Sequence, residues 1–228
     1  MNKEEVCSYK REMTKNVHDE GLEGIQMIEG AVALIEEMRK AVSLGEPQAA
    51  ELVIRALGHD YLRVREVAAE ELLKIGPPAV DVLLYALKDR DSDVRWLAAQ
   101  VLGHLGDPRA VEQLKAALRD EDLYVRKAAA GALRLLGWEP TEEAEAAWFF
   151  MASGYIRDCV EFVEAAKEAL VFALRDREWF IRADAVIALG EIGRPWVLYI
   201  LVSALRDEHD EVRKVASVAL RRLGYHGC

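Results

Sequence analysis

Apolar residues recur along the chain at the three-to-four spacing of one buried helix face, and no stretch shows the period-two alternation of a strand. The clearest example begins after Asp91 and Asp93, either of which is a candidate N-cap. Its buried face is predicted to consist of Val94, Ala98, Val101, Leu102 and Leu105. Gly106 suits the left-handed position after a helix, and Pro108 suits the first turn of the next one. The pattern therefore predicts two consecutive amphipathic helices.

This two-helix pattern occurs five times in register. A branched residue followed by arginine marks each copy, and the steps between copies are 30, 31, 56 and 31 residues. The 56-residue step is one period of 31 residues plus 25 inserted residues. The marker arginines are Arg65, Arg95, Arg126, Arg182 and Arg213, and the small residues that follow them are Ala68, Ala98, Ala129, Ala185 and Ala216. Such periodicity predicts an all-α fold, an α-solenoid (superhelix) of stacked antiparallel helix pairs.

The spacing of the copies divides the chain into four segments. We expect a polar N-terminal segment at 1–21 that is either a frayed helix or mobile, and repeats at 22–137. The repeats comprise a capping unit and units that start near 60, 91 and 122. Residues 138–163 are predicted to be a helical insertion rich in aromatic and acidic residues, and residues 164–228 resume the repeats and end in a single helix.

The repeated pattern D-x-x-x-x-V-R-x-x-A-x-x-A-L-x-x-L-G-D-P-x-A-V resembles the HEAT repeat, specifically the phycobilisome-lyase-like HEAT subclass. The resemblance covers about residues 45–228. The aspartate six residues before the arginine is present as Asp89, Asp120, Asp176 and Asp207. The resemblance implies the solenoid fold but leaves the function open, because the family includes scaffolds, chromophore lyases, a metal-dependent hydroxylase and DNA glycosylases.

We interpret the repeated arginines and aspartates as a structural ladder that sets the stacking of one unit on the next. A guanidinium offers five donors in a fixed fork, which a carboxylate or carbonyl oxygens of the preceding turn can accept. The alternative is an anion-binding row, which requires arginines that face an open groove. In the first copy His59 replaces the aspartate before Arg65, so we expect a weaker ladder at that end.

The insertion has two readings. In the first, its aromatic residues Trp148, Phe149 and Phe150 pack an extra helix pair over a kink in the solenoid. In the second, they form an exposed acidic and aromatic patch for a partner. Thr141 is a plausible N-cap of the inserted helix. Because no glycine follows the insertion, the linking helix is expected to run straight into 164–175.

The second helices of the copies are expected to line the concave side of the solenoid. When these helices are superposed, one equivalent surface position is apolar in most copies, and these residues form a first row. The next position along each helix forms a neighbouring row. These rows give the candidate binding residues Leu84, Tyr85, Lys115, Val171, Phe172, Tyr199 and Val202. The apolar row either helps to bury neighbouring helices or forms a strip that receives a helix or an extended peptide.

Charge and composition limit the classes of partner that the chain can bind. The net charge is −10, and residues 138–170 alone carry −6, which argues against nucleic acid and favours a basic protein or peptide. A second copy of the chain is also an open alternative. No apolar run reaches the roughly 18 to 20 residues that span a bilayer. Three distant cysteines form neither a disulfide framework nor a zinc site, which fits a cytoplasmic protein. The scarcity of Asn and Gln leans towards a thermophile.

No sequence motif indicates a catalytic centre. Phosphate-binding loops and nucleophile elbows are absent. A hydroxylase of this fold binds iron through His-Glu pairs, whereas none of the five histidines here is followed by Glu. We therefore expect no metal, no cofactor and no catalytic residue. The sequence favours a non-catalytic scaffold that binds a protein or peptide. The alternative is a tetrapyrrole-chromophore lyase, an isomerase or another groove-dependent enzyme on the same fold.

Overall fold

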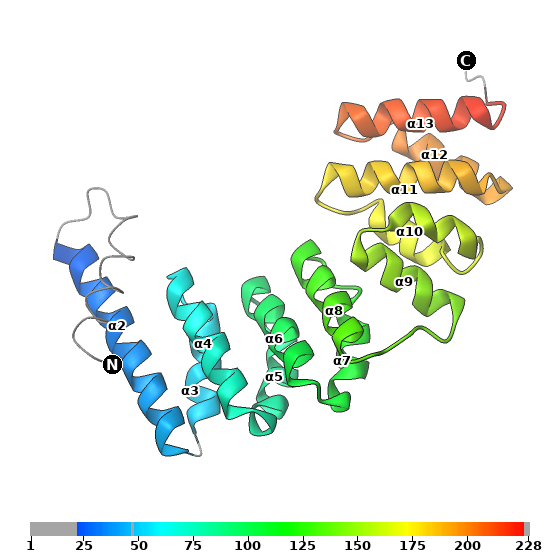
Figure 1. Ribbon diagram of the computed structural model, residues 1–228. Helices are drawn as coiled ribbons and strands as arrows, with labels where there is room; N and C mark the ends of the chain where they lie inside the picture. The colour runs from blue at the N-terminus through cyan, green and yellow to red at the C-terminus, as the bar shows by residue number, and fades with distance from the viewer. Residues whose placement is uncertain (1–21, 47, 226–228) are drawn as a thin grey trace. The chain divides into compact units, whose positions relative to one another are not determined.

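The computed structural model describes residues 22–46 and 48–225 as an array of paired helices (Figure 1). The predicted segment 1–21 lies outside the described residues. Within the described ranges there is no strand, so the expected all-α fold of stacked antiparallel helix pairs is confirmed. The chain forms two compact units, called unit 1 and unit 2, which divide between Leu114 and Lys115.

Unit 1 contains the first repeats. Its elements are α2 (Leu22–Leu44), α3 (Ala49–Arg55), η1 (Ala56–Gly58), α4 (Leu62–Ile75), η2 (Pro77–Ala79), α5 (Val80–Ala86), α6 (Ser92–Leu105), η3 (Pro108–Ala110) and the start of α7 (Val111–Ala117). The first helices form one layer, in which α4 packs between α2 and α6 (Figure 1). The second helices α3 and α5 pack against each other in the other layer.

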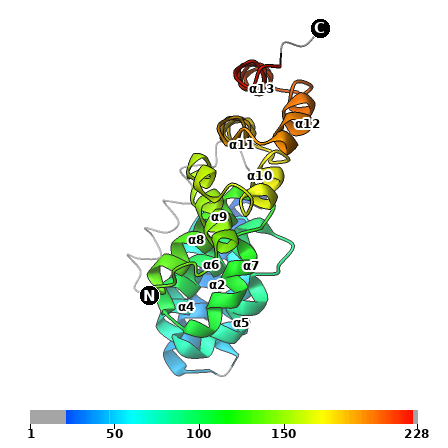
Figure 2. The same cartoon turned by 90° about the vertical axis from the view of Figure 1, so that its right-hand side faces the viewer.

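Unit 2 contains the insertion and the later repeats. Its elements after α7 are α8 (Leu123–Leu135), α9 (Glu143–Ser153), η4 (Ile156–Phe162), α10 (Lys167–Ala173), α11 (Trp179–Ile192), α12 (Pro195–Ala204) and α13 (Asp210–Arg222). The first helices α11 and α13 pack together and are seen nearly end-on in Figure 2, with α12 beside them. The inserted helix α9 packs against α8, η4 and α10.

The local signals of the sequence set the helix ends. Oδ1 of Asp91 accepts a hydrogen bond from the backbone N–H of Asp93 at 2.9 Å, which satisfies a donor that the first turn of α6 leaves free. Gly106 closes the same helix at φ 71°, where a side chain would be strained. The predicted cap and stop of this helix are therefore confirmed.

The small residues of the repeat allow close helix packing. All five repeated alanines are fully buried, as their spacing predicts: Ala68, Ala98, Ala129, Ala185 and Ala216. The closest approach described for a glycine lies between α11 and α13, where a Cβ on Gly190 would stand 2.7 Å from Cβ of Ala219. This distance leaves no space for a methyl group at Gly190.

Two details of the insertion differ from expectation. Thr141 does not cap α9, because Glu142 is the N-cap residue, and Thr141 instead donates from its N–H and hydroxyl to Oε2 of Glu145. The linking segment also does not run on as one helix. It forms η4 and then turns at residues 163–166 before α10 begins, because Val163 takes a non-helical conformation with φ −6° and ψ −64°.

Candidate ligand groove

The repeated arginines bind the turns that precede their own helices. Nη1 of Arg126 donates to the carbonyl oxygens of Asp120 and Glu121 at 2.9 and 3.1 Å. The other four marker arginines each make the same pair of bonds, to the carbonyls six and five residues earlier. This geometry turns the guanidinium groups towards backbone oxygens of the chain itself.

Aspartates of the later copies join one copy to the next in unit 2. Oδ1 of Asp176 accepts from the N–H of Glu178, while its Oδ2 accepts from Nη2 of Arg126, and both side chains are buried. Asp207 is held in the same way by Arg182, with two bonds of 2.9 Å. Burial raises the pKa of Asp207, but the hydrogen bonds from Arg182 and from the His209 N–H outweigh it and lower that pKa below its ordinary value.

In the first copy His59 stands where later copies have an aspartate, and the turn before the helix still forms. Nδ1 of His59 accepts from the N–H of Tyr61 at 3.1 Å, the bond that an aspartate makes in later copies. Arg65 still donates to the carbonyl of His59 at 2.7 Å. Its nearest carboxylate in the next copy, on Asp93, lies at 3.7 Å, so the ion pair there is longer than in unit 2.

The inserted helix covers part of the predicted binding row in unit 2. Trp148 is only 7% exposed, its ring meets that of Phe172 at 5.3 Å, and the guanidinium of Arg119 lies 4.6 Å from the Trp148 ring centre. Lys115 forms an ion pair with Glu145 of the insertion at 2.6 Å, which lowers the pKa of that carboxyl. Lys115 and Phe172 therefore bind the insertion and are not available to a partner in the way the sequence predicted.

The aromatic residues of the insertion contact one another. Phe149 meets Trp138 at 5.8 Å, and Phe150 meets Phe162 at 5.7 Å, with all four rings at least partly buried. Trp148 is thus buried, whereas Phe149 and Phe150 pack against aromatic neighbours and stay partly exposed. The expectation that these residues could form an exposed patch is wrong for Trp148, whose side chain fills the space over α10.

The remaining residues of the predicted row lie in different surroundings. Leu84, Val171 and Val202 are half-buried, as expected of a row that partly packs between neighbouring helices. The two tyrosines project outward, with exposures of 81% for Tyr85 on α5 and 85% for Tyr199 on α12. They lie in separate units, so each is considered with its own unit.

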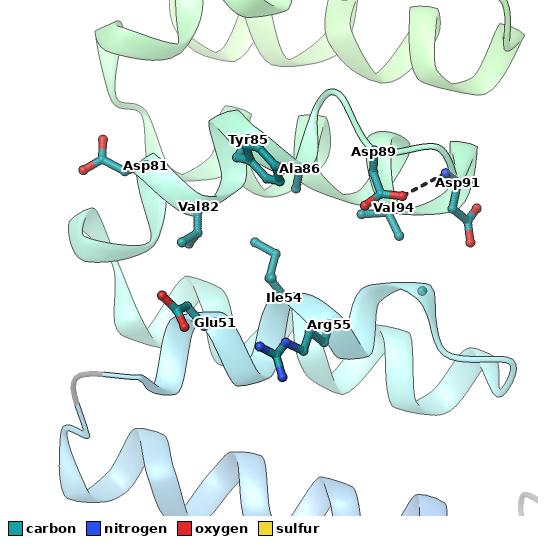
Figure 3. Close-up of a pocket in the computed structure, with 11 residues that line it drawn as sticks. Glu51, Ile54, Arg55, Asp81, Val82, Tyr85, Ala86, Asp89, Asp91 and Val94 are labelled. Atoms are coloured by element: carbon teal, nitrogen blue, oxygen red, sulfur yellow. Dashed lines mark hydrogen bonds between the residues drawn. The ribbon is translucent and has the colours of Figure 1, made fainter.

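A groove between α3 and α5 remains open in unit 1. It has a volume of about 700 Å³ and is called the unit-1 groove. Its lining residues are Glu51, Ile54, Arg55, Gly58, Asp81, Val82, Tyr85, Ala86, Asp89, Asp91 and Val94. Figure 3 shows Ile54 and Val82 pointing towards each other across it. This volume lies within the range of roughly 300 to 1,000 Å³ that is typical of small-molecule sites.

The groove has an apolar floor and an acidic rim. Asp81 lies at one end, whereas Asp89 and Asp91 lie at the other (Figure 3). Glu51 adds a fourth carboxylate and Arg55 the single guanidinium of the lining. The alignment of the second helices selected Tyr85 but did not predict this rim. Glu51 and Asp81 occupy the first turns of α3 and α5, and that shared helical position is the signal that could have revealed it.

The groove lining contains no sulfur nucleophile, and the described ranges hold no group of three His, Cys, Asp or Glu side chains that is placed for a metal ion. Cys159 of unit 2 is buried, and burial raises the pKa of its thiol to about 12. Its Sγ donates to the carbonyl of Ala147. None of the described helices combines the length and apolar character needed to cross a membrane.

Comparisons with known proteins agree with this architecture. A family model described as HEAT repeats matches residues 80–149 and 151–224. The bilin biosynthesis protein PecF of Nostoc sp. strain PCC 7120 is 29% identical over 171 residues, which are 74% of this chain and 92% of that protein. These matches confirm the resemblance to lyase-like HEAT proteins that the repeat pattern indicated.

Solved structures of the same kind also match. The complex of CpcE and CpcF of phycocyanin lyase from Nostoc sp. PCC7120 matches with a TM-score of 0.39 at 25% identity, over 75% of this chain and 97% of that chain. Human deoxyhypusine hydroxylase matches with a TM-score of 0.31 at 21% identity, over 98% of this chain and 97% of that chain.

The relatives correct one expectation from the sequence. The chain was expected not to be an enzyme, since it contains no catalytic motif. That expectation is wrong, because the relative that matches 74% of this chain is a bilin biosynthesis protein. The physical reason for the error is that motif searches detect nucleophiles, phosphate loops and metal ligands, whereas a groove that shapes a bound chromophore needs none of these.

Proposed function

This chain belongs to the HEAT-repeat family, and from that premise we propose that it is a lyase-like member that binds an open-chain tetrapyrrole, a bilin, in the unit-1 groove. The family alone fits many functions. The observation that carries the proposal is the 29% identity to a bilin biosynthesis protein, which extends over 92% of that protein. The similarity thus extends over nearly the whole length of the relative and is not confined to one repeat.

The chemistry of the unit-1 groove supports this ligand. A bilin is a linear series of four pyrrole-derived rings that carries N–H donors along its length and carboxylate side chains. The apolar floor around Ile54 and Val82 suits the rings, and the exposed ring of Tyr85 can stack on one of them. Carboxylates of the rim can accept the N–H donors, while Arg55 can pair with a carboxylate of the ligand.

In this role the groove contributes orientation. Holding a flexible linear chromophore in one conformation brings its reactive carbon to a fixed position and removes the entropy cost of finding it. Cys159 is not needed as a nucleophile, and its raised pKa keeps the thiol protonated at neutral pH. The acceptor of the chromophore would then be a partner protein, in line with the protein or peptide partner that the repeats predict.

Biliverdin added to the purified chain tests the proposal. We expect saturable changes in its visible absorbance, and weaker binding for Ile54→Glu, which places a charge on the apolar floor. Tyr85→Ala should also weaken binding, by about ten-fold if the ring stacks on the ligand. The matched control is Tyr199→Ala, which removes a tyrosine of similar exposure from unit 2.

Two results would reject the proposal. One is the absence of any saturable absorbance change with biliverdin. The other is equal weakening by Tyr85→Ala and Tyr199→Ala, which would mean that the groove is not the site. Haem serves as the ligand control, because its closed and rigid ring shares the pyrrole chemistry but not the linear shape. Equal affinity for haem would show that the groove does not recognise an open chain.

A protein or peptide bound along the second helices of either unit is the second candidate ligand, because each unit presents an outward tyrosine there, Tyr85 in unit 1 and Tyr199 in unit 2. Association of two copies through these faces would bury apolar side chains at about 25 cal/mol per Å². Leu84→Glu combined with Val202→Glu would then abolish association and keep the helical circular dichroism. Sedimentation of the parent at several concentrations decides whether copies associate at all.

A further inference from the structure

Three aromatic rings gather at the start of α11 and α13 in unit 2. The Trp179 ring lies parallel to the His209 imidazole, with centres 4.4 Å apart and planes 5° apart. Phe180 meets Trp179 edge-on at 6.0 Å. Trp179 and Phe180 remain 41% and 39% exposed. We call Trp179, Phe180 and His209 the aromatic edge.

The fold does not require aromatic residues at these two positions. Trp179 and Phe180 are the first two residues of α11. The corresponding first two residues are Ser92 and Asp93 in α6, and Asp210 and Glu211 in α13. Those helices form the same turn and the same arginine bonds with polar residues there. Two large rings that stay about two-fifths exposed therefore have no part in the repeat geometry, and exposed aromatic groups of this kind mark binding surfaces.

Carboxylates surround the aromatic edge. Glu178 precedes Trp179 and is exposed, and the side chain of Glu208, beside His209, is 84% exposed. The nearby cations bind groups of the chain itself, and one of them, Arg213, donates to the carbonyl oxygens of Asp207 and Glu208. Arg177 binds Glu121 at 3.3 Å, and Lys214 binds both Asp210 and Glu211. Arg182 pairs with both Asp207 and Glu208, so its single positive charge faces two negative charges. The surface around the rings is therefore negative.

We propose that the aromatic edge binds an arginine- or lysine-bearing segment of a protein partner. A cation placed over or beside an indole ring is attracted by the negative face of the ring, most strongly for tryptophan among the aromatic residues. Arginine adds planar stacking and donors for Glu178 and Glu208. The combination of exposed rings and an excess of carboxylates over cations favours a basic segment over an acidic or purely apolar one. This surface is independent of the bilin site and stands whether or not the unit-1 groove binds a tetrapyrrole.

Fluorescence anisotropy with a labelled octa-arginine peptide and the full chain tests the proposal. The parent should bind the peptide saturably, with affinity that falls as salt rises, and should not bind octa-glutamate. The double variant Trp179→Ser with Phe180→Asp installs the residues that α6 carries at the same positions, so the helix is expected to form. It should weaken binding by about ten-fold or more.

Two further variants separate the rings from the charges and from the fold. Glu178→Gln with Glu208→Gln leaves the rings in place and should weaken binding several-fold, which keeps the proposal testable even if the aromatic variant folds poorly. Tyr124→Asp is the matched control. Tyr124 is the second residue of α8, as Phe180 is of α11, and it is 67% exposed. Its replacement should leave peptide affinity unchanged.

Three outcomes would overturn the proposal. The first is no saturable binding of octa-arginine by the parent. The second is binding within two-fold of the parent by both the aromatic and the charge variants. The third is self-association of the parent that the aromatic variant abolishes, because the occupant would then be a second copy of the chain and not a basic segment.

Discussion

The marker arginine is present in all five copies of the repeat, and its contacts give the reason. A turn between two helices leaves carbonyl oxygens without partners, and Nη1 of each arginine fills two of them. In unit 2, Nη2 of Arg126 and both Nε and Nη2 of Arg182 donate to a carboxylate of the following copy. One side chain thus closes its own turn and fixes the next copy.

Replacing Arg126 by Ala is expected to destabilise the protein by about 3 to 5 kcal/mol, since the buried carboxylate of Asp176 loses its charged partner and keeps only the N–H of Glu178. This loss in the free energy of unfolding is larger than the roughly 1 to 3 kcal/mol expected from lost hydrogen bonds alone, because a buried ion pair is also broken. Arg65→Ala is the matched control, because Arg65 makes the same carbonyl bonds but only a 3.7 Å ion pair.

The control should lose about 1 to 2 kcal/mol. Urea unfolding followed by circular dichroism gives both values. Equal stability of Arg126→Ala and the parent would contradict the structural ladder and favour an anion-binding role for the arginines.

The lowered pKa of Asp207 predicts that the folded protein loses stability as the pH falls into the acid range. Its pKa is lower in the folded protein than its ordinary value of 3.8, because bonds from Arg182 and the His209 N–H outweigh the burial that raises it. A lowered folded-state pKa stabilises the protein fully above the unfolded value, and this stabilisation disappears as the pH falls through the folded-state value. The difference in Tm between the parent and Asp207→Asn should therefore be widest near neutral pH.

That difference should narrow as the pH falls below 3.8 and should close only below the folded-state pKa of Asp207, where both side chains are uncharged. Thermal melts between pH 7 and pH 2.5 provide the measurement. A difference that stays constant across this range would mean that the carboxylate charge of Asp207 does not contribute to folding.

At the scale of the helix, the sequence predicted the features that recur in every copy of the repeat and missed those of the insertion, which occurs once. The spacing of Ala68 and its equivalents predicts the buried face because five copies share one register. The insertion has no second copy to align, so its cap at Glu142 and its turn at Val163 could not be read in that way. The packing of Trp148 on Phe172 joins residues 24 positions apart, and no local spacing encodes such a contact.

The same limit applies to the candidate sites. Alignment of the second helices selected Tyr85, which is exposed in the structure, but it could not show that Glu145 reaches Lys115 and that Trp148 covers Phe172. The unit-1 groove depends on the absence of such a cover between α3 and α5. Absence of a neighbour is a property of the folded chain and not of any residue type.

A pair of glycine substitutions tests how closely first helices pack in unit 2. Gly190→Ala places a methyl group 2.7 Å from Cβ of Ala219, so α11 and α13 must separate, and we expect a loss of about 1 to 3 kcal/mol. Gly131 of α8 is the control, because nothing lies within 4 Å of the position of its added Cβ.

Gly131→Ala should stabilise the protein by about 0.4 to 1 kcal/mol, since alanine restricts the unfolded chain and favours the helix. Chemical denaturation of both variants gives the sign of each change. Stabilisation by Gly190→Ala would mean that α11 and α13 pack less closely than the structure has them.

At the scale of the whole molecule, the two compact units carry different chemistry. Unit 1 keeps an open groove with an apolar floor and four carboxylates, whereas unit 2 fills the equivalent face with the insertion and presents an aromatic edge. A bilin and a basic protein segment are therefore assigned to separate units. This division predicts that the two ligands bind without direct competition.

Hydrogen exchange of the full chain, measured by mass spectrometry, tests that division. Ligands that bind only the folded state stabilise it, and the slowed exchange concentrates where local opening exposes the bound surface. Biliverdin should slow exchange in α3 and α5, and octa-arginine should slow it at the start of α11 and in residues 207–211. Each ligand should leave the other region at its unliganded rate, also when both are present. Slowing of α11 by biliverdin, or release of biliverdin by saturating octa-arginine, would show that a single surface serves both ligands and that the assignment to separate units is wrong.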